Sequence, residues 1–221
     1  MTRDELAQLL DHSVLKPEAN EREVRAGAEA VREWRIGYYC VQPCWVATAA
    51  RALAGSDAGV VAVIGFPHGC ERTPVKASAA GLAVNDGARE LDMVLNLGAL
   101  KSGDWAAVGS DIAVVLRAVP GVPLKVILEA AALTDDEKRL ACRLIRDSGA
   151  AFVKTSTGFH AAGGATVADV RLMRAEVGAS FGVKASGGIR SLSDAMAMLE
   201  AGANRIGTSA SAAILAAAKA P

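Results

Sequence analysis

The chain has 221 residues with 24 basic and 24 acidic side chains, and 52% of its residues are hydrophobic. This length and apolar content suffice for a large core, so we expect a single domain over residues 1–221. A formal net charge of zero gives no basic field of the kind that nucleic acid or an anionic membrane attracts, which argues against both partners. Because the N-terminus lacks a signal-peptide pattern and no apolar run is long enough to span a bilayer, we expect a cytoplasmic protein.

The four cysteines do not form a recognisable framework. They stand at positions 40, 44, 70 and 142, and Cys40 and Cys44 have no matching second pair to complete a zinc site. The three histidines are too scattered for metal-ligand spacing. We therefore predict reduced thiols, mostly in the core, and neither a metal nor a cofactor.

Strand-like apolar runs recur along the chain and alternate with segments of helical composition. Helix-start signals stand at Thr134, Thr166 and Ser191. Eight such units in 221 residues average about 28 residues, close to the size of a βαβ module. This pattern predicts an α/β fold, a single-domain (β/α)8 TIM barrel, rather than an open doubly wound sheet, because no Gly-x-Gly-x-x-Gly follows the first run. The runs cover residues 9–12, 38–41, 60–65, 90–96, 124–129, 151–156, 183–186 and 204–209.

Alternation along four of these runs places polar side chains on one face, which we expect to point to the barrel axis. Barrel interiors are usually filled with bulky branched residues, so charged residues on neighbouring strands need a reason. A structural ion-pair network is one interpretation, and a catalytic site is the other. The inward faces comprise Asp92, Val94 and Asn96; Lys125, Ile127 and Glu129; Phe152, Lys154 and Ser156; and Lys184 and Ser186.

Two lysines favour the catalytic interpretation. Lys154 and Lys184 lie within strand-like runs one βα unit apart, which would place them on adjacent strands about 4.8 Å apart. A lysine in water is protonated at neutral pH and cannot attack a carbonyl until desolvation or a nearby cation lowers its pKa. One lysine could therefore form a Schiff base, while the other stays charged and joins Asp92 in moving protons.

Glycine-rich loops after the last two strands predict a phosphate site. Gly187 and Gly188 follow the seventh run, and Gly207-Thr-Ser209 closes the eighth. In a TIM barrel these two loops commonly bind a substrate phosphate through backbone N–H groups. A small molecule that carries a phosphate is therefore the expected partner.

The ordered motifs from residue 10 to residue 209 resemble the deoxyribose-phosphate aldolase family. The resemblance implies a metal-free class I aldolase that reversibly cleaves 2-deoxy-D-ribose 5-phosphate to D-glyceraldehyde 3-phosphate and acetaldehyde, in deoxyribonucleotide catabolism. A homodimer is a further expectation from the family. The motifs are LDHSVLKP (10–17), CVQP (40–43), VIGFPHG (63–69), ELDMVLN (90–96), LKVILE (124–129), VKTSTGF (153–159), VKASGGIR (183–190) and RIGTS (205–209).

The resemblance also implies roles for individual residues. It makes Lys154 the Schiff-base lysine and Lys184 with Asp92 the proton relay. Asp11 is expected near a sugar hydroxyl, and Lys125 is expected to support Asp92. The implied phosphate contacts are Gly158, Gly187, Gly188, Gly207 and Ser209.

The chain departs from some relatives at two positions that bear on the site. Phe159 stands where certain relatives carry a phosphate-binding lysine, so the phosphate site is expected to rely more on backbone groups. The only tyrosines are Tyr38 and Tyr39, so no tyrosine in a C-terminal tail can protonate the enamine, and we expect a water held by Asp92 and Lys184 to do so. The alternatives are another Schiff-base aldolase or an isomerase acting on a phosphorylated sugar, and a non-catalytic phosphosugar-binding barrel.

Overall fold

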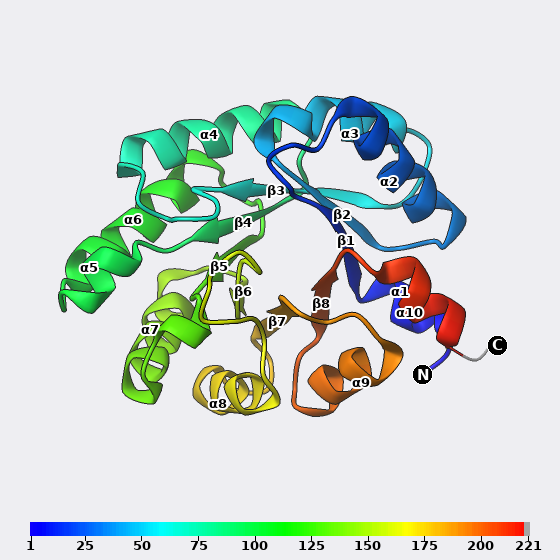
Figure 1. The fold of residues 1–221 in the computed structure, drawn as a ribbon. Coiled ribbons are helices and arrows are strands. Elements are labelled where there is room, and N and C mark those ends of the chain that lie inside the picture. Colours follow the sequence, from blue (N-terminus) through cyan, green and yellow to red (C-terminus); the bar gives the residue numbers. More distant parts are fainter. Residues whose placement is uncertain (219–221) are drawn as a thin grey trace.

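Eight parallel strands form a closed barrel in chain order in the computed structural model, which describes residues 1–218. Strand β8 pairs with β1 and closes the barrel, and helices surround it on the outside (Figure 1). The predicted TIM barrel is confirmed. The strands are β1 (Leu10–Val14), β2 (Tyr38–Val41), β3 (Gly59–Ile64), β4 (Glu90–Val94), β5 (Leu124–Ile127), β6 (Phe152–Lys154), β7 (Gly182–Ser186) and β8 (Arg205–Thr208).

The helices begin where the sequence carries capping residues. Thr134 and Ser191 each form a capping box with the acidic residue three positions later, and the Thr166 side chain accepts a hydrogen bond from the Asp169 backbone N–H. Within residues 1–218, no helix combines the length and the apolar character needed to cross a membrane. The helices are α1 (Arg3–Gln8), α2 (Glu21–Glu33), α3 (Val46–Ala52), α4 (Thr73–Asn85), α5 (Leu97–Lys101), α6 (Trp105–Ala118), α7 (Asp135–Ser148), α8 (Val167–Val177), α9 (Leu192–Glu200) and α10 (Ser211–Ala217), with 3-10 turns at Pro43–Trp45 and Ala130–Ala132.

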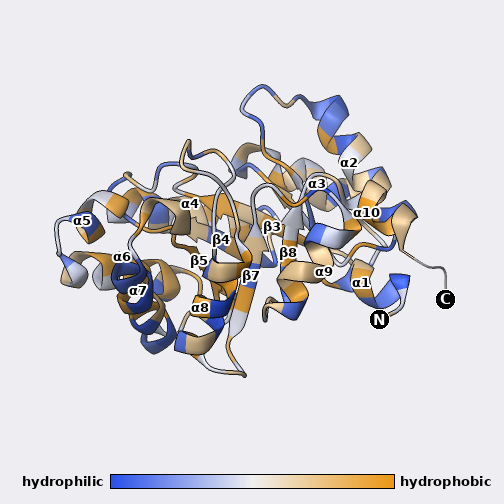
Figure 2. Ribbon diagram, turned by 60° about the horizontal axis from the view of Figure 1, so that its bottom comes forward, coloured by the Kyte–Doolittle hydropathy of each residue, from blue (hydrophilic) through white to orange (hydrophobic). Residues whose placement is uncertain are grey.

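Strand parity divides the core into an outer and an inner part. Leu91, Met93 and Val126 face outward and belong to the large core between the strands and the helices, where hydrophobic residues concentrate (Figure 2). A much smaller apolar cluster of Leu15, Cys40, Val61 and Val63 lies apart from it. The remaining inward positions of the strands are therefore free for polar side chains.

Three strands, β4, β5 and β6, end two residues earlier than the sequence pattern predicts. Strand β4 ends at Val94 because Asn96 caps helix α5 by accepting a hydrogen bond from the Ala99 N–H. Strand β5 ends at Ile127 because Glu129 adopts a left-handed backbone with φ 55°. The expectation that Asn96 and Glu129 continue the inward faces of their strands is therefore wrong.

Strand β6 ends at Lys154, so Ser156 does not continue the predicted run to residue 156. The chain turns here because the Glu129 carboxylate accepts hydrogen bonds from the backbone N–H and the hydroxyl of Thr157. This turn places Lys154 at the very end of a strand, where a barrel positions its functional side chains.

Candidate active site

Seven charged side chains meet inside the barrel, and none is more than 7% exposed. They come from six different strands whose inward positions converge on the barrel axis. A buried charge is stable only when it is paired, so their contacts define the chemistry of the site. The members are Asp11, Glu90, Asp92, Lys125, Lys154, Lys184 and Arg205.

Asp92 lies at the centre of this group, with no exposed surface. Its Oδ2 accepts hydrogen bonds from Lys154 Nζ at 2.6 Å and Lys184 Nζ at 2.7 Å. Its Oδ1 accepts one from Lys125 Nζ at 3.0 Å. Burial by itself would raise the pKa of Asp92, but the three lysines together hold it well below its usual value. Asp92 is therefore a carboxylate shared by three amines.

Lys184 is held in its charged form. Burial alone would lower its pKa, but the carboxylates of Asp11 and Asp92, to both of which it donates, raise that pKa well above the usual value. Lys125 bridges Asp92 and Glu90, the latter at 2.6 Å, and so supports Asp92 from the other side.

Lys154 behaves in the opposite way. Desolvation is the largest cause that lowers the pKa of Lys154, and the nearby charge of Lys184 lowers it further, while Asp92 acts against both. The balance is a pKa below the usual lysine value. Two neighbouring strand lysines thus differ in kind: Lys184 keeps its proton, and Lys154 is the amine that gives its proton up more readily.

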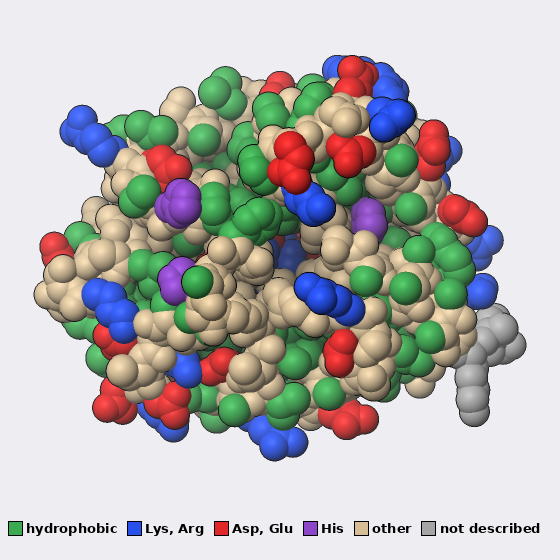
Figure 3. Space-filling model, viewed as in Figure 1, with side chains coloured by type: hydrophobic (Ala, Val, Ile, Leu, Met, Phe, Trp, Pro, Cys, Tyr) green, Lys and Arg blue, Asp and Glu red, His purple; other side chains and the backbone are tan. Residues whose placement is uncertain are grey.

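A pocket of about 530 Å³ opens above Lys154 at the carboxyl ends of the strands. Figure 3 shows the hollow in the middle of this face, with basic side chains on two sides of it. Of the seven buried charged residues named above, Lys154 is the one that lines this pocket. The exposed side chains of Lys16, Glu23 and Arg190 lie at its rim. Its glycine and hydroxyl lining includes Gly158, Gly187, Gly188, Gly207 and Ser209, so the structure brings together all five residues expected to bind phosphate.

The pocket wall also contains the residue that departs from the lysine-bearing relatives. Phe159 is 46% exposed and packs edge-on against Phe66, with ring centroids 5.3 Å apart. His12 lines the opposite part of the pocket, where its Nδ1 lies 3.2 Å from Ser211 Oγ. Burial lowers the pKa of His12, which makes its neutral form dominant at neutral pH.

Asp11, which the resemblance places near a sugar hydroxyl, belongs to the buried charged group. It is fully buried beneath Lys184, and its oxygens are taken by Lys184 and by Arg205, the latter at 3.0 Å. It does not line the pocket, so a direct contact with a sugar hydroxyl is not part of the function that we propose below. The role of Asp11 is to accept a hydrogen bond from Lys184 and to stabilise its charged form.

Sequence reasoning missed two members of the charged group, Glu90 and Arg205. Arg205 contacts Glu90 at 3.1 Å and stacks 3.5 Å from the centre of the Tyr38 ring. Each of them lies two residues from a predicted site residue on the same strand, Glu90 from Asp92 and Arg205 from Gly207, and therefore faces the same side of the sheet. That alternation was the signal that could have found them.

Neither tyrosine nor the inward cysteine is placed for proton transfer. Tyr39 is buried and donates its hydroxyl hydrogen to the Val24 carbonyl at 2.7 Å, and burial raises its pKa above the usual value. Cys40 is buried, and burial together with nearby Asp92 raises the pKa of its thiol to about 11. Cys40 is therefore a neutral thiol at the site. Within residues 1–218, no three His, Cys, Asp or Glu side chains gather as metal ligands would.

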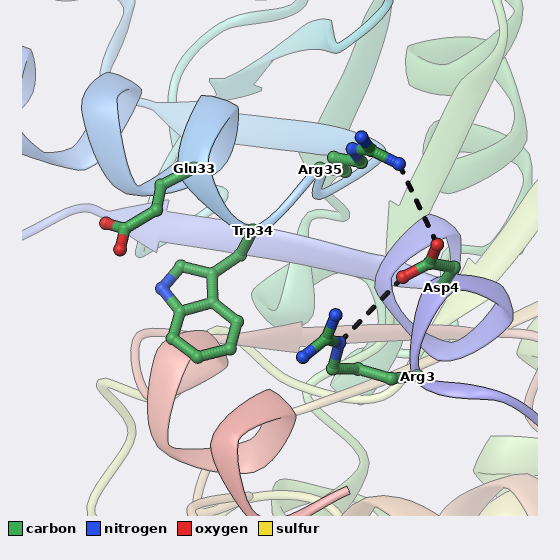
Figure 4. Close-up of a pocket in the computed structure, with 5 residues that line it drawn as sticks. All are labelled: Arg3, Asp4, Glu33, Trp34 and Arg35. Atoms are coloured by element: carbon green, nitrogen blue, oxygen red, sulfur yellow. Dashed lines mark ion pairs between the residues drawn. The ribbon is translucent and has the colours of Figure 1, made fainter. Parts of the chain in front are cut away.

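A second hollow, of about 450 Å³, lies at the amino-terminal ends of strands β1 and β2. It is lined by residues of α1 and of the end of α2, among them Trp34 (Figure 4). Asp4 lies 3.8 Å from Arg3 and 3.9 Å from Arg35; Asp4 and Arg35 are exposed, and Arg3 is half-buried. Ion pairs near the surface contribute little to stability. Active sites of TIM barrels lie at the carboxyl ends of the strands, so this hollow at the amino-terminal ends is not the candidate active site.

Because Gly207 has no side chain, the side chain of Lys184 has room to pass beside it. A Cβ at this position would lie 2.9 Å from Ser186 Cβ and 3.1 Å from Lys184 Cε. We therefore expect Gly207→Ala to lower the free energy of unfolding by about 1–3 kcal/mol and to lower kcat/KM by displacing Lys184. Urea unfolding and steady-state kinetics measure both effects. Gly81→Ala is the control, because a Cβ there meets no atom within 4 Å; an unchanged kcat/KM in Gly207→Ala would contradict the assigned position of Lys184.

Solved aldolases share this barrel. The structure superposes on the aldolase QR15 with a TM-score of 0.92 at 39% identity, covering 96% of this chain and 94% of that one. A tetrameric deoxyribose phosphate aldolase from Aeropyrum pernix matches with a TM-score of 0.90 at 32% identity, over 97% of this chain and 91% of that one.

Sequence relatives identify the family. The family model described as DeoC/LacD family aldolase matches residues 6–217. The deoxyribose-phosphate aldolase of Streptococcus pneumoniae serotype 19F (strain G54) is 51% identical over 210 residues, 95% of each chain. The enzyme of the same name from Enterococcus faecalis is 51% identical over 212 residues, 96% of each chain. The chain belongs to the DeoC/LacD family of aldolases, and the protein is a lyase.

Proposed function

We propose that this aldolase reversibly cleaves 2-deoxy-D-ribose 5-phosphate to D-glyceraldehyde 3-phosphate and acetaldehyde by a class I, Schiff-base mechanism. The observation that carries the proposal is the contrast between the two strand lysines. Lys154 lines the pocket and has a lowered pKa, whereas Lys184 is covered and keeps its charge. An uncharged amine that a substrate carbonyl can reach is what imine formation requires.

The pocket supports a phosphorylated substrate. Its volume of about 530 Å³ suits a small molecule, and glycines of two successive loops form one side of it. Gly158, Gly187 and Gly188 all have positive φ angles, and Gly164 and Gly187 pack so closely that a Cβ on Gly164 would lie 2.3 Å from the Gly187 carbonyl oxygen. Such a side-chain-free surface lets an anion approach backbone N–H groups. Lys16 and Arg190 add two positive charges at the rim, against one negative charge from Glu23.

Lys154 carries the covalent steps of the proposed reaction. The neutral Nζ of Lys154 attacks C1 of the open-chain sugar, and loss of water from the carbinolamine gives an iminium ion. That cation accepts the electron pair of the breaking C2–C3 bond as the C3 hydroxyl passes its proton to a water beside Asp92 and Lys184. The step releases glyceraldehyde 3-phosphate and leaves an enamine. Protonation of the enamine carbon and hydrolysis then free acetaldehyde and Lys154.

Asp92 and Lys184 form the proton relay in this proposal. Both lysines contact the same oxygen of Asp92, so a proton can pass between Lys184 and the reacting Lys154 through that carboxylate or a water beside it. A water held by this pair protonates the enamine, since Tyr39 is committed to the Val24 carbonyl. Lys125 fixes the other oxygen of Asp92.

We expect purified protein to release acetaldehyde and glyceraldehyde 3-phosphate in equal amounts from 2-deoxyribose 5-phosphate. Chelator should leave the rate unchanged, because Lys154 supplies the electron sink. Unphosphorylated 2-deoxyribose should be cleaved with a kcat/KM lower by at least about 100-fold, since it lacks the charge-assisted hydrogen bonds of the phosphate. Product quantification on both sugars measures this. Absence of cleavage would favour another Schiff-base aldolase or an isomerase of phosphorylated sugars.

Two properties expected from the sequence also belong to this proposal. An enzyme of deoxyribonucleotide catabolism works on soluble phosphorylated sugars, which fits a cytoplasmic protein. A homodimer stays a prediction, and the relative from Aeropyrum pernix is a tetramer.

A further inference from the structure

The buried charges below the pocket form a closed ring of alternating sign. None of its six members is among the residues that line the pocket. Arg205 donates to Asp11 at 3.0 Å and to Glu90 at 3.1 Å, and Lys125 continues from Glu90 at 2.6 Å. The ring runs in the order Asp11, Lys184, Asp92, Lys125, Glu90, Arg205 and back to Asp11.

Arg205 and Glu90, the ring members on the side away from Lys154, are held by packing and burial as well as by their ion pairs. The Arg205 guanidinium stacks 3.5 Å from the centre of the Tyr38 ring and 5.4 Å from that of Phe152. Arg205 and Glu90 are each 7% exposed. Burial alone would lower the pKa of Arg205, but the carboxylates of Asp11 and Glu90 raise it above its usual value, so the guanidinium is a permanent cation.

The charge of the ring sums to zero without Lys154. Its three carboxylates are matched by three cations, and each cation touches two carboxylates. Lys154 is a fourth cation that touches Asp92 alone, on the oxygen that Lys184 also uses. When Lys154 loses its proton, the buried group becomes neutral overall. When Lys154 keeps it, one uncompensated charge stays buried, which is costly.

We propose that Glu90 and Arg205 are positioning residues that keep this ring neutral, and that the ring thereby selects Lys154 as the amine that is uncharged when substrate arrives. The inference rests on the proposed function, in which Lys154 is the nucleophile. It adds that residues remote from substrate set the pH range of the reaction.

The other groups that face Lys154 do not supply this selection. Strand β2 contributes Cys40, whose raised pKa keeps it neutral, and β3 contributes the apolar Val61 and Val63. Asp92 and Lys184, the charged residues that most affect Lys154, belong to the ring. Lys16, Glu23 and Arg190 line the same pocket but are exposed, so solvent and salt screen their charges. A change of one ring charge therefore acts on Lys154 with no nearby group to absorb it.

Two substitutions of opposite sign test the proposal through the pH profile of kcat/KM on 2-deoxyribose 5-phosphate. Glu90→Gln leaves the ring with one excess positive charge, so we expect the acidic limb to move down by about one pH unit, a tenfold change in the proton dissociation constant of Lys154. Arg205→Gln leaves one excess negative charge and should move the limb up by about the same amount. The double variant should return it to the wild-type position.

Matched controls separate this effect from a structural one. Arg205→Lys keeps the charge and should leave the limb in place. Asp111→Asn removes a carboxylate from the buried pair with Lys76, which lies outside the ring, and should lower stability without moving the limb. Ionisation of the substrate phosphate is common to all variants, so differences between them come from the protein. If Glu90→Gln fails to fold, the two Arg205 variants still test the proposal: the acidic limb should move up in Arg205→Gln and stay in place in Arg205→Lys.

The ring proposal is overturned if the acidic limb stays in place in Glu90→Gln and Arg205→Gln, or moves in the same direction in both. The proposed function survives that result as long as borohydride traps substrate on Lys154 of the wild-type protein. Absence of that adduct in the wild-type protein instead overturns the proposed function, and the ring proposal with it. The two failures are therefore distinguished by the trapping experiment.

Discussion

Lys154→Met abolishes imine formation and is expected to lower kcat/KM by at least about 10³-fold. Methionine has a similar length and tolerates a buried site, and Lys154 is only 2% exposed, so the fold should persist. The remaining lysine of the pair cannot take over, because Lys184 is covered and keeps its proton. Steady-state kinetics on folded protein, with circular dichroism for the fold, measures the effect.

Lys76→Met is the matched control for Lys154→Met. Lys76 is also buried, and it donates to Asp111 at 2.6 Å in a pair between helices α4 and α6. Its loss leaves Asp111 without a partner and should destabilise the protein by about 3–5 kcal/mol, with kcat per folded molecule unchanged. A Lys154→Met protein that retains more than a tenth of the wild-type kcat/KM would show that another residue is the nucleophile.

Asp92→Asn is expected to lower kcat by about 10²–10⁴-fold, the usual contribution of a proton-transfer group. It also leaves the three lysines around position 92 without their shared carboxylate, so the free energy of unfolding should fall by about 3–5 kcal/mol. Removal of Asp92 takes away the carboxylate to which Lys154 donates, and this favours the neutral form of Lys154. The acidic limb of the pH profile should therefore move down while kcat falls.

Asp111→Asn serves as the comparison for Asp92→Asn, because it removes one carboxylate from another buried lysine pair. We expect it to lower stability in urea by a similar amount and to leave kcat of the folded protein near the wild-type value. If Asp92→Asn lost stability but kept its kcat, Asp92 would be a structural ion-pair partner and not part of the relay.

Much of the site could be predicted from the sequence because strand parity is a local property. Asp92, Lys125 and Lys184 alternate with apolar residues that face the helices, and the register indeed pairs Asp92 with Lys125 and Lys154 with Lys184. The glycines at the pocket were recognisable because backbone approach to an anion needs residues without a side chain.

The rest depends on contacts between residues far apart in the chain. Glu90 and Arg205 are separated by 115 positions, and only closure of the barrel brings their strands into reach. Asn96 and Glu129 fit the alternation of their runs, yet a helix cap and a hydrogen bond to Thr157 take them out of the strands. The burial of Asp11 beneath Lys184 likewise follows from the stagger of the barrel, which sequence spacing does not define.

The most direct test of the account is borohydride reduction in the presence of 2-deoxyribose 5-phosphate, followed by peptide mass spectrometry. A reduced adduct on the peptide that contains Lys154, absent from Lys154→Met protein, is the predicted result. An adduct on Lys184, or an active enzyme that forms no adduct, would contradict the assignment of Lys154 as the Schiff-base lysine.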